Sequence, residues 1–218
     1  MTVAAVIVSA TAREAVAPAD GSPRVRRMAD AAWAGGAVPV IVVAPDPDGV
    51  VSEALAGSEA RLVPPAGASL QLAALMTHGF RAATEAIRET DAALLWPDGL
   101  CWADAETLTS LIEAHGADRG VVFRPSWRGR EGWPALVPVE ALASLLAVHL
   151  GATPEDVLGI LAGAGHRRVA IDLGDPGTVL DATTPRAGLP PYEGPLRPMS
   201  GHHHEWGAAA HDDPAQGG

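Results

Sequence analysis

The chain contains no lysine, one cysteine and no long hydrophobic run, and each absence excludes a class of protein. All 15 basic residues are arginine, and the net charge of −11 argues against nonspecific nucleic-acid binding. The single cysteine, Cys101, excludes an internal disulfide and suits a reducing cytoplasm. No stretch approaches the roughly 18 apolar residues that a membrane helix needs. We therefore expect a cytoplasmic protein with neither nucleic-acid nor membrane partners.

The order of apolar runs predicts an α/β fold. The first run, Val3–Val8, is interpreted as a buried strand and not as a signal peptide, because no cationic region precedes it. Short β-branched runs then alternate with longer helical segments, which is typical of a mostly parallel, Rossmann-like sheet in a three-layer α/β/α domain. The predicted strands are Val3–Val8, Val38–Val43, Ala60–Val63, Ala92–Trp96, Gly120–Phe123 and Arg168–Leu173. The predicted helices are Arg24–Gly35, Leu70–Arg88, Ala105–His115, Val139–Leu150 and Pro154–Ala162, with Ser69, Asp104 and Thr153 as N-caps.

The alternating pattern stops near Arg186. The 218 residues suit one domain, expected over residues 1–187, followed by a disordered tail rich in Gly, Pro and His over residues 188–218. Imidazoles at His202–His204 and His211 suit Zn²⁺, Ni²⁺ or Cu²⁺. A solvated tail or the remnant of an expression tag is the favoured interpretation, because a flexible segment must be ordered before it binds metal.

Two aspartates occupy positions where a carboxylate can meet a ligand. Asp98 follows a predicted strand, and ligands of open parallel sheets bind beyond the carboxyl ends of strands, where a carboxylate can hold Mg²⁺ against a phosphate. Pro97-Asp98-Gly99 is equally a strong turn signal. Asp181 follows a turn at residues 174–177 and is either a second metal ligand or a loop cap.

A loop over residues 128–133 contains two arginines and two glycines. Arg128 and Arg130 can bind a phosphate as planar bidentate donors, or they can be solvated on an exposed hairpin.

Three segments, Leu94–Leu100, Arg128–Leu136 and Gly174–Pro185, occur in an order that resembles the MobA-like NTP transferases, most closely the MocA-like branch that attaches CMP to the molybdenum cofactor. The resemblance implies transfer of NMP from CTP or GTP to a small phosphorylated acceptor such as molybdopterin, with Mg²⁺ as cofactor and a partner in molybdoenzyme maturation. It also implies site residues: catalytic Asp98; metal ligands Asp98 and Asp181; nucleotide contacts Ser9, Thr11, Arg13 and Ser69; acceptor contacts Arg128, Arg130 and Trp133.

The family's glycine-rich phosphate loop and its lysine are missing. The segment Val8–Pro18 contains no glycine, Thr11 occupies the first loop-glycine position, and Glu14 adds a negative charge where a triphosphate would lie. Arg13, Arg24 or Arg26 could supply the missing charge.

Two other motifs depart from the family at single positions: Trp133 replaces a histidine, and Thr183 replaces the acid before Thr-Pro. Two hypotheses follow: an active nucleotidyltransferase, or a degenerate member that binds a nucleotide, cofactor or partner without turnover.

Overall fold

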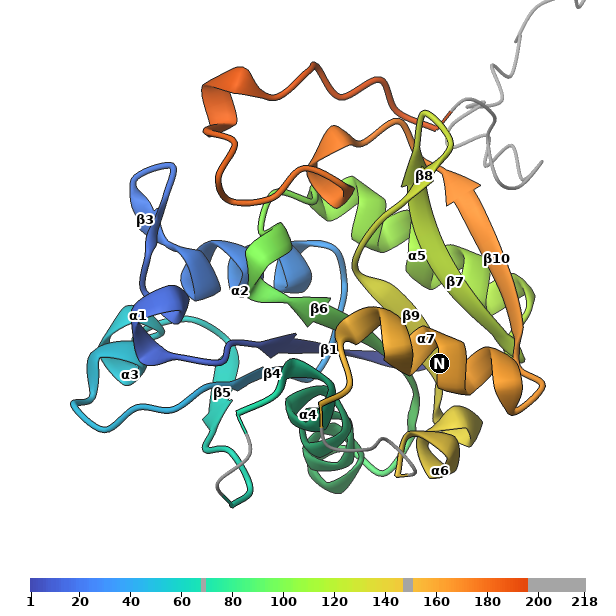
Figure 1. The fold of residues 1–218 in the computed structure, drawn as a ribbon, viewed down its shortest axis with the longest axis horizontal. Coiled ribbons are helices and arrows are strands. Elements are labelled where there is room, and N and C mark those ends of the chain that lie inside the picture. Colours follow the sequence, from blue (N-terminus) through green and yellow to red (C-terminus); the bar gives the residue numbers. More distant parts are fainter. Residues whose placement is uncertain (68–69, 147–150, 196–218) are drawn as a thin grey trace, which may run out of the picture.

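The computed structural model describes residues 1–67, 70–146 and 151–195. A central sheet has helices packed on both faces, which confirms the three-layer α/β/α class (Figure 1). The strand order is β10-β7-β9-β6-β1-β4-β5, and β8 pairs with β7 outside this path. The strands are β1 Thr2–Val8, β4 Val40–Val43, β5 Ala60–Val63, β6 Thr90–Pro97, β7 Val121–Trp127, β8 Arg130–Glu131, β9 Ala135–Pro138 and β10 Arg167–Asp172, while β2 Pro18–Ala19 and β3 Ser22–Pro23 form a separate hairpin.

Two of the three predicted N-caps are confirmed. Asp104 caps α5, and Thr153 forms a capping box with Asp156 at the start of α7, as expected from their sequences. None of the helices in the described ranges is long and apolar enough to cross a membrane. The helices are α1 Ala12–Ala15, α2 Arg24–Ala34, α3 Val50–Ala54, α4 Leu72–Ala86, α5 Ala105–Ala117, α6 Leu142–Leu145 and α7 Pro154–Gly163, with 3₁₀ turns η1 Asp98–Leu100, η2 Val139–Ala141, η3 Pro176–Thr178 and η4 Arg186–Gly188.

The register of the sheet places two loops side by side. Strand β1 runs parallel to β4 and β6, and Val8 is aligned with both Val43 and Pro97. The residues that follow β1 and β6, Ser9 and Asp98, therefore emerge together at the carboxyl edge of the sheet.

The part of the core that underlies the carboxyl edge is the pair of buried strands β1 and β6, with helix α4 packed closely on them. Every residue from Ala92 to Asp98 is buried, and so is every residue from Val3 to Ser9. A Cβ at Gly79 in α4 would lie 2.4 Å from Val6 Cγ1, so glycine is what allows the helix to approach β1. This packing fixes the positions of the strand ends from which the loops after β1 and β6 begin.

Several predicted boundaries are wrong. Strand β7 continues to Trp127 instead of ending at Phe123, and the antiparallel strand β9 was not predicted. Helix α4 begins at Leu72 with Gln71 as its N-cap, and Ser69 lies outside the described residues. The helix expected over residues 139–150 is a 3₁₀ turn followed by the short α6, and residues 147–150 lie outside the described ranges.

The chain after β10 crosses the carboxyl edge of the sheet, above η1 in Figure 1. The Trp133 amide donates to the Thr178 carbonyl at 2.9 Å, and the Ala182 amide donates to the Gly99 carbonyl at 2.8 Å. The Glu193 amide donates to the Gly174 carbonyl at 3.0 Å, so contacts with the core continue beyond residue 187. The domain boundary at residue 187 stays a prediction, and the His-rich segment lies outside the described residues.

Candidate functional site

Asp98 lies directly after β6 and is 5% exposed. The fully buried Ser9 hydroxyl donates to Asp98 Oδ2 at 2.5 Å. Arg24, the first residue of α2, places Nη1 3.7 Å from the same oxygen. Burial raises the pKa of Asp98, while the Ser9 hydrogen bond and the Arg24 charge oppose that shift. The resemblance named Ser9 and Asp98 for different roles and Arg24 as one of three possible cations, and the structure places all three side by side.

In the segment that occupies the position of the phosphate loop, Thr11 and Glu14 are hydrogen-bonded to each other. Thr11 has φ −137°, an ordinary extended backbone, and its hydroxyl oxygen accepts from the Glu14 amide at 3.1 Å. The Thr11 hydroxyl also donates to Glu14 Oε2 at 2.9 Å. The resulting α1 has 4 residues, and Arg13 on it is exposed and makes no ion pair with any described residue. The amide and side chain that could receive a phosphate thus bind each other.

Asp181 lies at the same edge of the sheet as Asp98. Its carboxylate accepts from the Thr183 amide at 2.9 Å and from the Thr183 hydroxyl. These hydrogen bonds lower the pKa of Asp181, and the Arg24 charge lowers it further. The hydrogen bond from the Ala182 amide to the Gly99 carbonyl joins the two aspartate loops, with Arg24 acting on both carboxylates.

These side chains, as they stand, do not fit an Mg²⁺ site. Asp98 Oδ2 accepts a hydrogen bond from the Ser9 hydroxyl and faces the guanidinium of Arg24, so this oxygen already has a cationic neighbour where Mg²⁺ would bind. Among the described residues, no group of three or more His, Cys, Asp or Glu is arranged to hold a metal ion.

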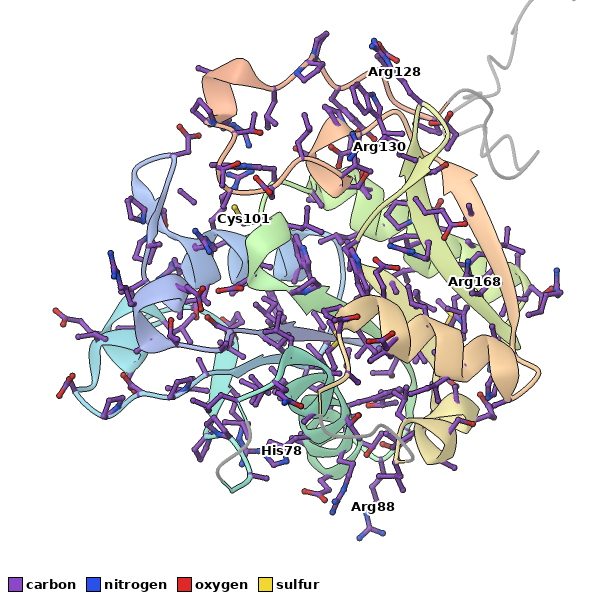
Figure 2. All side chains as sticks on the ribbon, in the orientation of Figure 1. His78, Arg88, Cys101, Arg128, Arg130 and Arg168 are labelled. Carbon is purple, nitrogen blue, oxygen red and sulfur yellow. The ribbon has the colours of Figure 1, made fainter. Side chains whose placement is uncertain are left out.

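A cavity of about 370 Å³ adjoins the Asp181 loop, and its lining includes Trp102, Thr183 and Arg186. The Arg27 guanidinium lies over the Trp102 ring, 5.2 Å from its centroid, and Nε donates to the Cys101 carbonyl at 3.3 Å. Cys101 directly follows η1 (Figure 2). Burial lowers the pKa of Arg27, and the nearby charge of Arg186 adds to this shift. Sequence reasoning missed these residues, because no spacing rule connects α2 with residues 102 and 186.

The expected acceptor residues are separated. Arg128 and Arg130 lie on the hairpin that joins β7 to β8 (Figure 2). Arg128 stacks over Trp127 at 4.6 Å and pairs with Glu193 at 3.3 Å, whereas Arg130 is exposed and makes no ion pair with any described residue.

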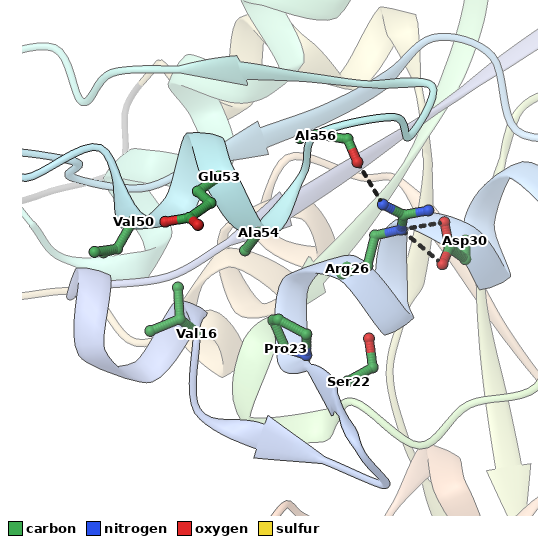
Figure 3. A pocket seen from close by; sticks show the side chains of 9 residues that line it. All are labelled: Val16, Ser22, Pro23, Arg26, Asp30, Val50, Glu53, Ala54 and Ala56. Atoms are coloured by element: carbon green, nitrogen blue, oxygen red, sulfur yellow. Dashed lines mark hydrogen bonds and ion pairs between the residues drawn. The ribbon is translucent and has the colours of Figure 1, made fainter.

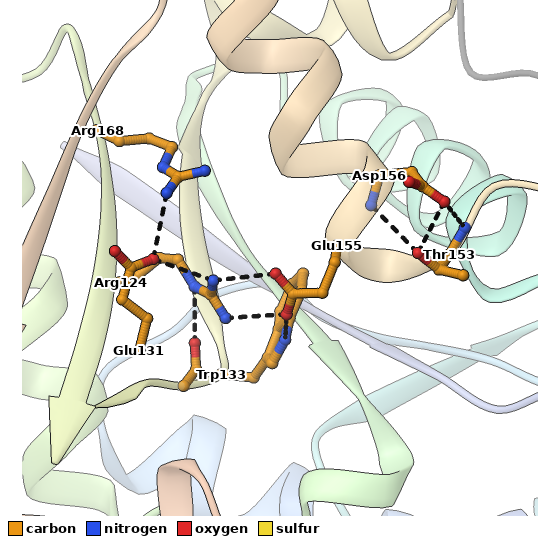
Figure 4. A network of polar contacts seen from close by, with 8 residues as sticks. Arg124, Glu131, Trp133, Thr153, Glu155, Asp156 and Arg168 are labelled. Carbon is orange, nitrogen blue, oxygen red and sulfur yellow. Dashed lines mark hydrogen bonds and ion pairs between the residues drawn. The ribbon is translucent and has the colours of Figure 1, made fainter. Parts of the chain in front are cut away.

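Trp133 faces inward and is 3% exposed. Its indole N–H donates to Glu155 Oε1 at 2.8 Å, and its ring lies 5.0 Å from the Arg124 guanidinium (Figure 4). Arg124 in turn donates from Nε to the Gly132 carbonyl at 2.9 Å and reaches Glu155 with both terminal nitrogens at 3.2 Å. Trp133 therefore supports the base of the hairpin whose tip presents the two arginines.

Comparison with solved structures shows the fold. A nucleotidyl transferase from Methanothermobacter thermautotroptrophicus matches at TM-score 0.63 and 21% identity, over 78% of this chain and 87% of that one. A 4-diphosphocytidyl-2C-methyl-D-erythritol synthase matches at TM-score 0.64 and 18% identity, over 86% of this chain and 94% of that one. Rv0371c of Mycobacterium tuberculosis H37Rv, in complex with manganese, matches at TM-score 0.59 and 17% identity, over 79% and 89%.

A search of curated proteins gives no match. The model of the MobA-like NTP transferase domain matches residues 12–168, which is most of the folded part of the chain. That match begins just after Ser9 and Thr11 and includes Arg24, Asp98 and the β7–β8 hairpin. This nucleotidyltransferase-like chain therefore belongs to the MobA-like NTP transferase domain family.

Proposed function

We propose that this chain binds a cytidine or guanosine nucleotide at the edge formed by Ser9, Asp98 and Asp181, and no longer transfers the nucleotidyl group. The observation that carries the proposal is the state of Asp98, whose Oδ2 is already engaged by Ser9 and Arg24. Family membership supports a nucleotide as the ligand. The cavity of about 370 Å³ beside Asp181 is at the small end of the range for small-molecule sites.

Because the phosphate loop is missing, we expect the chain to bind a triphosphate only weakly. A triphosphate needs oriented amides and a cation, but Thr11 and Glu14 satisfy each other and Glu14 repels the anion. The loss of two or three charge-assisted hydrogen bonds costs several kcal/mol, on the order of a thousandfold in affinity.

The remaining assignments belong to the same proposal. Ser9, Thr11 and Arg13 lie at the β1 end of the nucleotide site, and Ser69 is assigned to it by the resemblance. The hairpin arginines Arg128 and Arg130, supported by Trp133, are assigned to a phosphorylated acceptor or a partner, in the cytoplasm and in connection with molybdoenzyme maturation.

A second candidate function is active transfer of CMP or GMP to a molybdopterin-type phosphate, as in the MocA-like branch. It is favoured by the hydrogen bond that joins the Asp98 and Asp181 loops, because two carboxylates at one edge are what Mg²⁺ and a triphosphate need. This function requires Arg24 to leave Asp98 before Mg²⁺ binds.

Calorimetric titration with CTP, GTP and ATP, with and without Mg²⁺, separates the two functions. The proposal expects weak binding of CTP or GTP and no pyrophosphate release when molybdopterin is added. Micromolar Mg²⁺-dependent binding together with pyrophosphate release would establish the enzyme instead. Binding of no nucleotide by protein with an intact thermal transition would overturn both functions and leave the partner-binding role.

A further inference from the structure

Arg24, which is partly buried, differs from the buried Arg124 in its hydrogen bonds. The Arg124 side chain is 5% exposed and donates hydrogen bonds to the Gly132 carbonyl, Glu131 and Glu155 (Figure 4). The Arg24 side chain is 15% exposed, yet within the described ranges its guanidinium donates no hydrogen bond, and its Nε is buried without an acceptor. A buried donor without a partner calls for an explanation such as an absent ligand. Arg24 is thus held by charge alone, with its donors unused.

The carboxylate oxygen that Arg24 faces is the one that a metal ion would bind. Its Nη1 is 3.7 Å from Asp98 Oδ2, and its charge also acts on Asp181. A divalent cation at the same oxygen would be repelled by the guanidinium and would have to displace the Ser9 hydroxyl, which lies at 2.5 Å. Arg24 and Mg²⁺ therefore compete for this carboxylate oxygen.

A second observation points to an anionic ligand. Two more arginines, Arg27 and Arg186, approach the same edge around Trp102. Arg27 makes no ion pair with any described carboxylate, and its contacts are the Trp102 ring and the Cys101 carbonyl. Arg186 pairs with Asp20 at 3.3 Å, and both residues line the 370 Å³ cavity. Guanidinium groups with spare donors are the usual binders of phosphate.

We propose that Arg24 replaces the divalent cation of this site, so that the chain binds the phosphate of a nucleoside mono- or diphosphate without a metal ion. This inference rests on the proposed nucleotide-binding function. The ligand's phosphate receives hydrogen bonds from the free donors of Arg24, and Arg27 adds a second positive charge. A mono- or diphosphate suits the site better than a triphosphate, because the Thr11 hydroxyl and the Glu14 amide already bind within the turn and the Glu14 carboxylate repels further phosphates.

The test is a calorimetric titration of the whole chain with CMP, CDP, GMP and GDP, once in EDTA and once in Mg²⁺. We expect at least one of these nucleotides to bind, with affinity equal in the two buffers or lower in Mg²⁺, because Mg²⁺ neutralises the phosphate that Arg24 must attract. Arg24→Gln should lower the affinity in EDTA about tenfold or more, as expected for the loss of a charge-assisted contact.

The matched control is Arg26→Gln, which removes the same charge from the same helix. Arg26 pairs with Asp30 and donates to the Ala56 carbonyl in a separate pocket of about 580 Å³ (Figure 3), so its loss should change affinity less than about twofold. If Arg24→Gln does not fold, Arg24→Lys keeps the charge and tests the hydrogen-bond donors, and the wild-type comparison of buffers needs no variant.

The outcomes separate this inference from the function on which it rests. Binding that appears only with Mg²⁺ leaves nucleotide binding intact but overturns the role of Arg24. An equal loss of affinity in Arg24→Gln and Arg26→Gln has the same consequence. Binding of no nucleotide in either buffer, by folded protein, overturns the proposed function itself.

Discussion

Replacing Arg124 by Met should lower the free energy of unfolding by about 3 kcal/mol, because this arginine joins β7, the β8 hairpin and α7. The bond from Nε to the Gly132 carbonyl is fully buried and contributes about 1–2 kcal/mol. Glu131 and Glu155 have side chains 38% and 63% exposed, so each pair contributes only about 0.5 kcal/mol. The contact with the Trp133 ring adds about 1 kcal/mol.

Urea unfolding measures this loss, and thermal melting should show a fall of roughly 6–12 °C. The matched control is Arg168→Met, because Arg168 pairs with the same Glu131 at 3.4 Å but its side chain is 37% exposed. We expect the control to cost less than about 0.5 kcal/mol. An Arg124→Met cost that is no larger than the Arg168→Met cost would refute the reasoning.

Three further predictions concern the edge of the sheet. Asp98→Asn should stabilise the fold by about 1 kcal/mol at neutral pH. Burial raises the pKa of Asp98 above its ordinary 3.8, so the wild type loses stability as pH rises from that value through the folded-state pKa. The melting temperatures of the two proteins should therefore converge at low pH, and an advantage of the variant that grows toward low pH would contradict this sign. Asp175→Ala should cost about 2–4 kcal/mol in urea unfolding, since Asp175 accepts from the Asp104 amide, the Thr107 hydroxyl and the Gly177 amide at 2.9, 2.7 and 2.8 Å; a cost below about 1 kcal/mol would show that water replaces these donors. Gly132→Ala should cost about 1–3 kcal/mol in urea unfolding, because its Cβ would lie 2.3 Å from the Thr178 carbonyl oxygen. An unchanged unfolding midpoint would mean that the loop containing Thr178 moves to make room for the methyl group.

The parts of the fold that local sequence determines were predicted well. The apolar runs of β1, β4 and β6 are buried strands, and the caps at Asp104 and Thr153 form because a side-chain oxygen and an amide three or fewer residues away suffice. The caps need no distant partner, and an unbroken apolar run indicates a buried strand whichever strands it pairs with.

The parts that distant residues determine were missed. Strand β7 continues through Arg124, which is buried there only because Glu155 and the Gly132 carbonyl satisfy its guanidinium. Strand β9 follows Pro134 and ends at Pro138, and it pairs antiparallel with β6. Pairing partners of this kind lie dozens of residues away, and no local periodicity reports them.

The candidate site divides in the same way. The sequence placed Asp98 at the end of its strand and named Arg13, Arg24 and Arg26 as alternative sources of charge. Only the packing of α2 beside β1 decides among them, bringing Arg24 to Asp98 while Arg26 turns to Asp30 and Arg13 remains exposed.

The most direct test of the central claim is a crystal structure of the protein grown with CDP or GDP and Mn²⁺, with anomalous scattering used to locate manganese. We predict a phosphate within hydrogen-bonding distance of the Arg24 guanidinium and no anomalous peak at Asp98. A manganese peak between Asp98 and Asp181, with Arg24 displaced, would contradict the claim.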